Sequence, residues 1–349
     1  MELKFDQAFV YKTIEEIMAI DSPSGFTKAA VEYVEKVAQG WNLPFTWTRK
    51  GNGIITLEGK DPSKCYGVCA HVDTLGLMVR SIKGNGHLAI TRIGGALLPT
   101  LDSELCKVYT RDGKVYDGTI FCTSPAAHVY PDARTKERDE NGLEVILDEK
   151  VKTKADVEAL GICAGDFICY TPKTVITPSG FIKSRFLDDK LSVAIILGVI
   201  KYMVDNNIQP EYNIKFIMST YEEVGHGMSY IPSDIEELLC IDMGCIGLDL
   251  SCTEFDVSIC AKDSGGPYNY EMTTKLINIA KENNLQYAVD IYPMYGSDAG
   301  ASLRAGHDIR AALIGAGVFA SHGYERTHWE AVDNSMKLLY HYCTRKEII

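Results

Sequence analysis

The sequence has no long hydrophobic run, no cysteine pair with Cys-x-x-Cys spacing, and fewer basic than acidic residues. No apolar run approaches the roughly 20 residues that a membrane-spanning helix needs. The first residues, MELKFDQAF, lack the basic and apolar regions of a signal peptide, so we expect a cytoplasmic protein. The formal net charge of −12 argues against nucleic acid and anionic membranes as partners, because a phosphate-binding surface needs an excess of Lys and Arg.

The eleven cysteines are an odd number and lack the spacing of a zinc knuckle or a redox pair. We therefore expect most of them to be reduced thiols in the core, where cysteine behaves as a small hydrophobic residue. The length of 349 residues allows two domains, and 46% hydrophobic with 23% charged residues is ordinary for a globular protein. Disordered and fibrous classes are excluded.

Hydrophobic periodicity predicts an α/β protein with an inserted β-rich domain. The chain opens with two expected helices followed by two strands, as an α/β domain does. Residues 77–177 instead show short alternating apolar stretches separated by turns with glycine. We predict a catalytic domain of residues 1–76 and 178–349, interrupted by a domain of residues 77–177. The expected helices cover residues 5–20, 27–37, 153–160, 191–204 and 333–343, and the expected strands near the site cover 66–70, 212–220, 236–241 and 311–318.

Two adjacent glutamates, Glu222 and Glu223, follow the expected strand 212–220. Neighbouring residues at a strand end point to opposite sides, so one carboxylate can bind a cation while the other faces a substrate. Taken alone, such a pair is more often a solvated loop feature, because acidic side chains are mostly exposed. The remaining sequence has to decide between the two interpretations.

His71 and Asp73 follow another expected strand. Positions i and i+2 of an extended chain lie on one face, so Asp73 can accept the second ring N–H of His71 and fix its tautomer. This arrangement is typical of a metal ligand with its orienting partner, although a structural histidine explains an isolated His-x-Asp more simply.

Further carboxylates and histidines lie at similar places. Asp188 and Asp189 precede an apolar helix, where capping explains one of them but not readily both. Asp242 follows the strand 236–241, and His322 follows the strand 311–318. Since ligands gather beyond the carboxyl ends of strands in open α/β sheets, these residues are expected to lie together.

Two imidazoles and three carboxylates suit a pair of divalent transition ions with one bridging aspartate. A water held by the two ions is acidified enough to attack a substrate near neutral pH. Glu222 would take its proton and pass it to the leaving group. The candidate metal ligands are His71, Asp188, Glu223, Asp242 and His322.

Several motifs resemble those of the dinuclear-metal aminopeptidases of the glutamyl aminopeptidase and TET (tetrahedral, self-compartmentalising) family, some of whose members are called endoglucanases. They occur in the family's order over nearly the whole chain. The resemblance implies a zinc-exopeptidase-like α/β sandwich with an inserted β-barrel-like dimerisation domain, and assembly into a homo-oligomer such as the family's hollow dodecamer. The motifs are AHVDTLGLM (70–78), RFLDDK (185–190), YEEVG (221–225), IDMG (241–244) and GSDAGA (296–301).

The family's roles agree with the roles assigned from the residues alone. The resemblance implies that Asp188 bridges two ions, zinc or cobalt, and that Asp73 orients His71. It also implies that Glu222 is the general base and that peptides with a free N-terminus are the substrates. The implied ligands of the two ions are His71, His322, Asp188, Glu223 and Asp242. The final segment contains a second histidine, His328, but the spacing to the last helix favours His322.

Two other functions use the same residues. A deacylase of N-acyl amino acids needs the same metal centre and differs only in its substrate pocket. A metal-binding scaffold without activity is the non-enzymatic alternative, although the proposed base and ligands are chemically intact. The preferred N-terminal residue is set by loops that have no readable sequence code.

Overall fold

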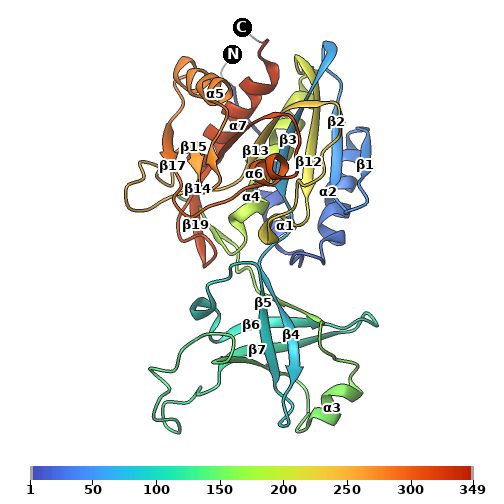
Figure 1. Ribbon diagram of the computed structural model, residues 1–349, viewed down its shortest axis with the longest axis vertical. Helices are drawn as coiled ribbons and strands as arrows, with labels where there is room; N and C mark the ends of the chain where they lie inside the picture. The colour runs from blue at the N-terminus through green and yellow to red at the C-terminus, as the bar shows by residue number, and fades with distance from the viewer. Residues whose placement is uncertain (1–2, 347–349) are drawn as a thin grey trace. The chain divides into compact units, whose positions relative to one another are not determined.

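The computed structural model describes residues 3–346, which divide into two compact units (Figure 1). One unit contains the chain up to Asp73 and from Lys173 onward, and the other contains Thr74–Pro172. The second unit ends at Pro172 rather than at residue 177, since β10 (Val175–Ile176) pairs with a strand of the first unit. Within residues 3–346, no helix is both long enough and apolar enough to cross a membrane.

A ten-stranded mixed sheet forms the centre of the first unit. In it, β3 (Asp61–His71) pairs in parallel with β12 (Tyr212–Ser219) and β13 (Ile235–Ile241), and β13 pairs in parallel with β18 (Arg310–Val318). The carboxyl ends of these four strands therefore lie at one edge of the sheet. The other strands are β1 (Phe45–Trp47), β2 (Gly53–Leu57), β14 (Gly244–Cys245), β15 (Val257–Asp263), β16 (Gly266–Pro267) and β17 (Tyr287–Ile291).

Helix α4 (Leu187–Asp205) is the central helix of this unit, and its residues from Leu187 through Ile200 are all buried. It contacts β3, β18 and two other helices, as a helix that is apolar on every side requires. The helix begins at Leu187 rather than at residue 191, and Asp188 and Asp189 in its first turn have non-helical backbone angles. The other helices are α1 (Gln7–Met18), α2 (Lys28–Gly40), α5 (Tyr270–Glu282), α6 (Asp298–Arg304), α7 (Trp329–Thr344) and the 3-10 helix η2 (Glu222–Val224).

A separate three-stranded sheet joins two distant segments of the first unit. Its central strand β11 (Phe181–Ser184) is antiparallel to β19 (Glu325–His328), which places Ser184 opposite Glu325. The chain continues from β11 into α4, and it enters β19 from the loop after β18. This pairing therefore brings the start of α4 next to the loop that contains His322.

The second unit is a closed six-stranded barrel in the order β4-β5-β8-β7-β6-β9. Alternate side chains point inward and fill the interior, as with Leu77, Ile90 and Ile120, which have no exposed surface. The predicted fold class, an α/β domain with a β-barrel-like insertion, is confirmed. The elements of this unit are β4 (Gly76–Ile82), β5 (Leu88–Ile93), η1 (Leu98–Leu101), β6 (Glu104–Tyr109), β7 (Val115–Cys122), β8 (Leu143–Leu147), α3 (Lys154–Ala159) and β9 (Phe167–Tyr170).

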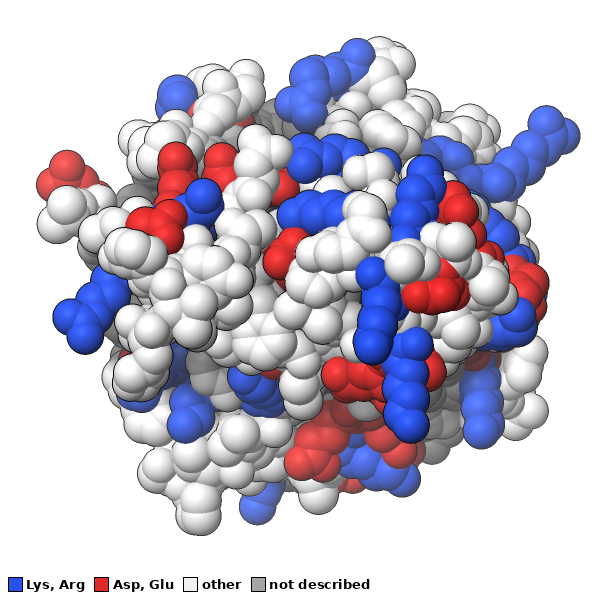
Figure 2. Space-filling view, turned by 90° about the horizontal axis from the view of Figure 1, so that it is seen from below, with Lys and Arg blue, Asp and Glu red and all other residues white. Residues whose placement is uncertain are grey.

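The charged side chains on the face shown in Figure 2 are of both signs. Lys and Arg are interspersed with Asp and Glu, and uncharged areas lie between them. On this face, the described residues form no continuous basic surface of the kind that binds a nucleic-acid backbone.

Gly315 lies in β18, where a Cβ atom would fall 1.7 Å from the carbonyl oxygen of Asp242. We predict that Gly315→Ala lowers the free energy of unfolding by about 3 kcal/mol or more, because the backbone beneath Asp242 would have to move. Gly247→Ala is the matched control, since a Cβ there meets nothing within 4 Å. Neither glycine has a positive φ, so the comparison isolates the steric effect. Denaturant unfolding measures both values, and equal stability of the two variants would contradict the prediction.

Candidate metal centre

The candidate site is built at the carboxyl edge of the central sheet. His71 is the last residue of β3, and Asp242 directly follows β13. Glu222 and Glu223 form the first turn of η2, just after β12. Parallel pairing of β3 with β12 and β13 brings these side chains together, because it aligns the strand ends.

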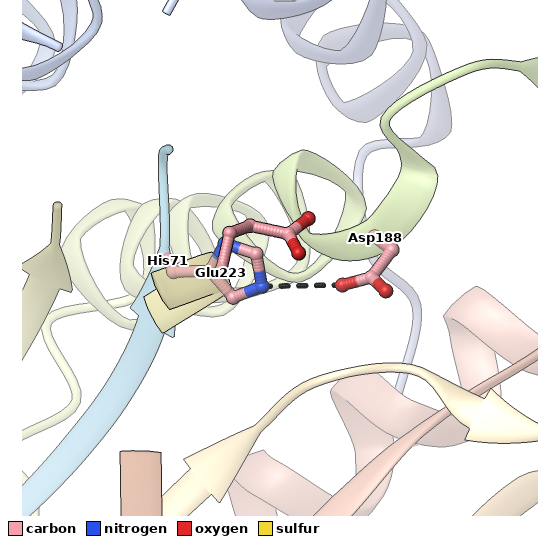
Figure 3. Close-up of side chains that lie close together, drawn as sticks. All are labelled: His71, Asp188 and Glu223. Atoms are coloured by element: carbon pink, nitrogen blue, oxygen red, sulfur yellow. Dashed lines mark hydrogen bonds and ion pairs between the residues drawn. The ribbon is translucent and has the colours of Figure 1, made fainter. Parts of the chain in front are cut away.

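Asp188 lies between the two histidines. Its Oδ1 atom is 3.1 Å from Nε2 of His71, and its Oδ2 atom is 3.4 Å from Nε2 of His322. Figure 3 shows His71, Asp188 and Glu223 facing one another, with the contact between His71 and Asp188 dashed. An aspartate that presents one oxygen to each of two imidazoles has the arrangement that a bridging ligand requires.

Two groups of ligand atoms are close enough to surround a cation. Atoms of His71, Asp188 and Glu223 lie within 4.8 Å of one another, and the same holds for His71, Asp189 and Asp242. His322 adds to the first group, with its Nε2 atom 3.7 Å from Oε2 of Glu223. The Oε1 atom of Glu223 is buried without a hydrogen-bond partner, as expected of a carboxylate oxygen reserved for a metal. The residues therefore fit the divalent ions that the sequence predicts.

The site concentrates negative charge away from water. Burial raises the pKa of Asp242 to about 7, with a further contribution from the charge of Asp188. Burial also raises the pKa values of Glu222 and Glu223 well above the usual range. Carboxyl groups in this situation bind either protons or cations, so metal binding here is expected to release protons.

The pKa of His71, the histidine between these carboxylates, is raised by its neighbours by more than burial lowers it. Burial lowers the pKa of His71, but its hydrogen bonds with Asp188 and Asp73 and the nearby carboxylates raise it well above its usual value. Burial raises the pKa of Asp188, whereas both histidines lower it, and the pKa falls below its usual value. The two imidazoles thus stabilise the ionised carboxylate of Asp188.

Asp73 contacts His71 and also the backbone of both glutamates. The Nδ1 atom of His71 is 2.8 Å from the backbone oxygen of Asp73 but 3.5 Å from its carboxylate. The carboxylate also accepts hydrogen bonds from the backbone N–H groups of Glu222, at 3.1 Å, and Glu223, at 3.2 Å, and from the hydroxyl of Ser24. Asp73 therefore orients His71 through its carbonyl group and positions both glutamates through its side chain.

Asp189 contacts the site from the other side. The peptide bond between Asp188 and Asp189 is cis. The Oδ2 atom of Asp189 accepts a hydrogen bond from the backbone N–H of His71 at 3.0 Å, and its Oδ1 atom is buried. This side chain supports His71 rather than serving only as a helix cap.

Two buried side chains near the site carried no readable sequence signal. Glu325 accepts hydrogen bonds from the backbone N–H groups of His322, at 2.9 Å, and Asp188, at 3.1 Å. The hydroxyl of Tyr295 is buried, and burial raises its pKa well above the usual value, with contributions from the charges of Asp242 and Asp188. Both side chains lie near residues that are distant in the sequence, so no local pattern reveals them.

The GSDAGA motif supports the loop that carries the glutamates. Its Asp298 accepts hydrogen bonds from the hydroxyl of Ser219, the last residue of β12, and from the backbone N–H of Met228 at 2.8 Å. Lys50 also holds this loop, since its Nζ atom donates to the carbonyl group of His226 and, at 2.9 Å, to the hydroxyl of Ser229. The motif acts here through hydrogen bonds to the chain before and after the glutamates.

His328 lies away from this cluster. Its Nε2 atom is 2.8 Å from the carbonyl oxygen of Ser179, and its Nδ1 atom accepts the backbone N–H of Glu330 at 3.2 Å. The ring packs against Phe181 and Phe255, with centroids 4.9 Å from each. His328 is thus the N-cap of α7, and His322 is the histidine that contacts Asp188.

Known proteins resemble this chain in both sequence and structure. A Bacillus subtilis protein with the name "Putative aminopeptidase YhfE" is 44% identical over 330 residues, which cover 94% of this chain and 95% of that protein. A lysyl aminopeptidase from Pyrococcus furiosus is 25% identical over 175 residues, covering 50% of this chain and 48% of the enzyme.

Solved structures share the fold over nearly the full length. A TET aminopeptidase from a marine sediment archaeon, Thaumarchaeota archaeon SCGC AB-539-E09, has a TM-score of 0.86 at 18% identity, with 97% of this chain and 98% of that chain covered. The TET1 peptidase of Pyrococcus horikoshii, which can assemble into a tetrahedron or a large octahedral shell, has a TM-score of 0.84 at 20% identity, with 97% and 100% covered. The sequence model of the M42 glutamyl aminopeptidases matches residues 51–338. In agreement with the resemblance seen in its motifs, the chain belongs to the M42 glutamyl aminopeptidase family.

Proposed function

We propose that this peptide hydrolase removes N-terminal residues from peptides by means of two divalent ions bridged by Asp188. The observation that carries the proposal is the position of the Asp188 carboxylate, with one oxygen facing His71 and the other facing His322. The excess of buried carboxylates around it also favours a cationic group such as the protonated α-amine of a peptide.

In this proposal each ion has its own histidine and carboxylate. Asp242 would complete the set with His71, and Glu223 would complete the set with His322. Nitrogen and carboxylate oxygen ligands suit zinc or cobalt. When bound, the ions would supply an acidified water and polarise the scissile carbonyl group.

Glu222 is the proposed general base. Its Oε2 atom lies 3.7 Å from Nε2 of His71, and its backbone is fixed by Asp73. Burial raises its pKa, which suits a group that accepts a proton near neutral pH. Glu222 would take a proton from the attacking water and donate it to the leaving amine nitrogen.

Matched peptides with free and acetylated N-termini test the proposed substrate class. We expect release of the first residue from the free peptides only, by protein that metal analysis shows to hold two ions per chain. Cleavage of N-acyl amino acids without cleavage of free peptides would favour a deacylase. Metal-loaded protein that cleaves neither class would favour a binding scaffold. A panel of different N-terminal residues would then define the preference.

Separate substitutions test the division of labour between the two glutamates. Glu222→Gln should lower kcat by roughly a hundredfold or more, because a general base contributes about 10²–10⁴ in rate, while the metal content stays at two ions. Glu223→Gln should lower the metal content, since it removes a charged ligand. The two substitutions are chemically identical and adjacent, so each controls for the other. Equal metal loss in both variants would contradict the proposed roles.

We also propose that the inserted unit, expected at residues 77–177 and found at Thr74–Pro172, mediates dimerisation within a larger homo-oligomer. Exposed apolar side chains on this unit support the proposal, among them Leu105 at 58% and Val129 at 71% exposed. Leu105→Glu and Val129→Glu should lower the molar mass measured by light scattering, because they place a charge in the interface. Lys150→Glu, at an exposed position of the same unit, is the control. An unchanged assembly in both test variants would contradict the proposal.

The proposed compartment is the cytoplasm. All eleven cysteines are free thiols, and most are buried, which suits a reducing environment. Cell fractionation would test this location.

A further inference from the structure

The side chain of Glu325 connects two segments of the candidate metal centre. Glu325 is the first residue of β19 and lies opposite Ser184 of β11. The residue is 1% exposed. A buried carboxylate is costly unless its oxygen atoms are hydrogen-bonded, so the identity of its partners shows what it stabilises.

Each oxygen of Glu325 accepts one backbone N–H group from a proposed metal ligand. Oε2 accepts from Asp188 at 3.1 Å, and Oε1 accepts from His322 at 2.9 Å. The Nε2 atom of His322 in turn lies 3.4 Å from Oδ2 of Asp188. A single carboxylate therefore binds the backbone of both proposed ligands.

The backbone around His322 has an unusual conformation, and the backbone at Asp188 departs from a helix. Asp188 has φ −78° and ψ 100° within the first turn of α4, where a regular helix cannot form. His322 has a φ of 64° and Ala320 a φ of 61°, in the left-handed region that non-glycine residues rarely adopt. Conformations of this kind persist when surrounding contacts fix them, and Glu325 supplies such a contact to both segments.

The other histidine is linked to Glu325 only through Asp188. His71 is the last residue of β3, its backbone N–H is bound by Asp189, and its Nδ1 atom contacts the carbonyl group of Asp73. The side chain of His71 is 1% exposed, whereas that of His322 is 35% exposed. His71 thus has backbone supports of its own, whereas Asp188 is shared by the two histidines.

We propose that Glu325 is a positioning residue that fixes Asp188 and His322 for one of the two ions. Loss of its carboxylate then weakens the ion at His322 and Glu223 more than the ion at His71 and Asp242, because the first loses support for both His322 and Asp188 and the second loses support for Asp188 alone. This inference rests on the proposed dinuclear function and adds to it a residue that contacts neither the ions nor the substrate.

Substitutions at Glu325 separate this role from a general effect on folding. Glu325→Gln replaces one acceptor oxygen with an N–H donor, so only one of the two backbone groups can still be bound. Glu325→Asp keeps the charge but is one methylene shorter, so it cannot reach both groups. The control is Glu330→Gln, since Glu330 lies five positions later and its side chain is 56% exposed.

Calorimetric titration of the chelator-stripped full-length protein with Zn²⁺ or Co²⁺ measures the two affinities. We expect two binding events in the wild type and in Glu330→Gln. In Glu325→Gln, one event should weaken by roughly 10- to 100-fold, which is the usual effect of losing an outer hydrogen bond to a metal site. The other event should weaken clearly less, because it shares only Asp188 with Glu325. The absorption spectrum of bound Co²⁺ reports the same loss independently of activity.

A second comparison uses the background His322→Ala. Adding Glu325→Gln to this variant should cause a smaller further loss of affinity than it causes in the wild type, because one of the two ligands that Glu325 positions is already missing. If Glu325→Gln does not fold, as judged by circular dichroism, Glu325→Asp serves for the same titrations.

The outcomes distinguish the inference from the proposed function. Equal weakening of both events, or no weakening of either, would overturn the role of Glu325 while two ions and cleavage of free peptides in the wild type would still support the function. A wild-type protein that binds fewer than two ions would overturn both.

Discussion

The removal of several like charges from water is the constraint on which this structure depends. Five carboxylates, those of Asp188, Asp189, Glu222, Glu223 and Asp242, surround two imidazoles at one edge of a sheet. Two unit charges 4 Å apart interact by about 4 kcal/mol at an effective dielectric constant of 20, a large amount beside a total stability of about 5–15 kcal/mol. The surrounding fold must therefore hold groups that repel one another until cations neutralise them. Parallel strand pairing provides the positions, and hydrogen bonds from buried side chains provide the orientation.

Much of the fold and the location of the candidate site could be predicted from local patterns. Strands with apolar residues and period-2 alternation were readable, and so were the residues that end them, such as His71 and Asp242. Since parallel strands align their ends, residues far apart in sequence could be expected to meet. Element bounds were less readable: α4 begins four residues before the expected position because Asp188 and Asp189 form an irregular first turn.

The supporting contacts could not be predicted, because they join segments that share no local pattern. Glu325 and Asp188 are separated by 137 positions, and only the pairing of β11 with β19 brings them together. The carboxylate of Asp73 was expected to contact His71 two residues away and lies 3.5 Å from its Nδ1 atom, but it also binds the backbone of Glu222 and Glu223 about 150 positions later, which no local spacing predicts. Spacing along one strand does not reveal whether a side chain or a backbone carbonyl group is the nearer acceptor.

The contacts of Asp73 limit how this enzyme family member can change. Asp73 contacts the imidazole of His71 through its main chain and binds Glu222 and Glu223 through its side chain. The positions of all three groups therefore depend on this one residue. If the proposed roles hold, a substitution of Asp73 is expected to alter metal affinity and proton transfer together. Independent change of the proposed base is therefore restricted to the opposite side of the loop, where Asp298 and Lys50 bind the chain before and after it. New activities in this scaffold would be expected to begin there.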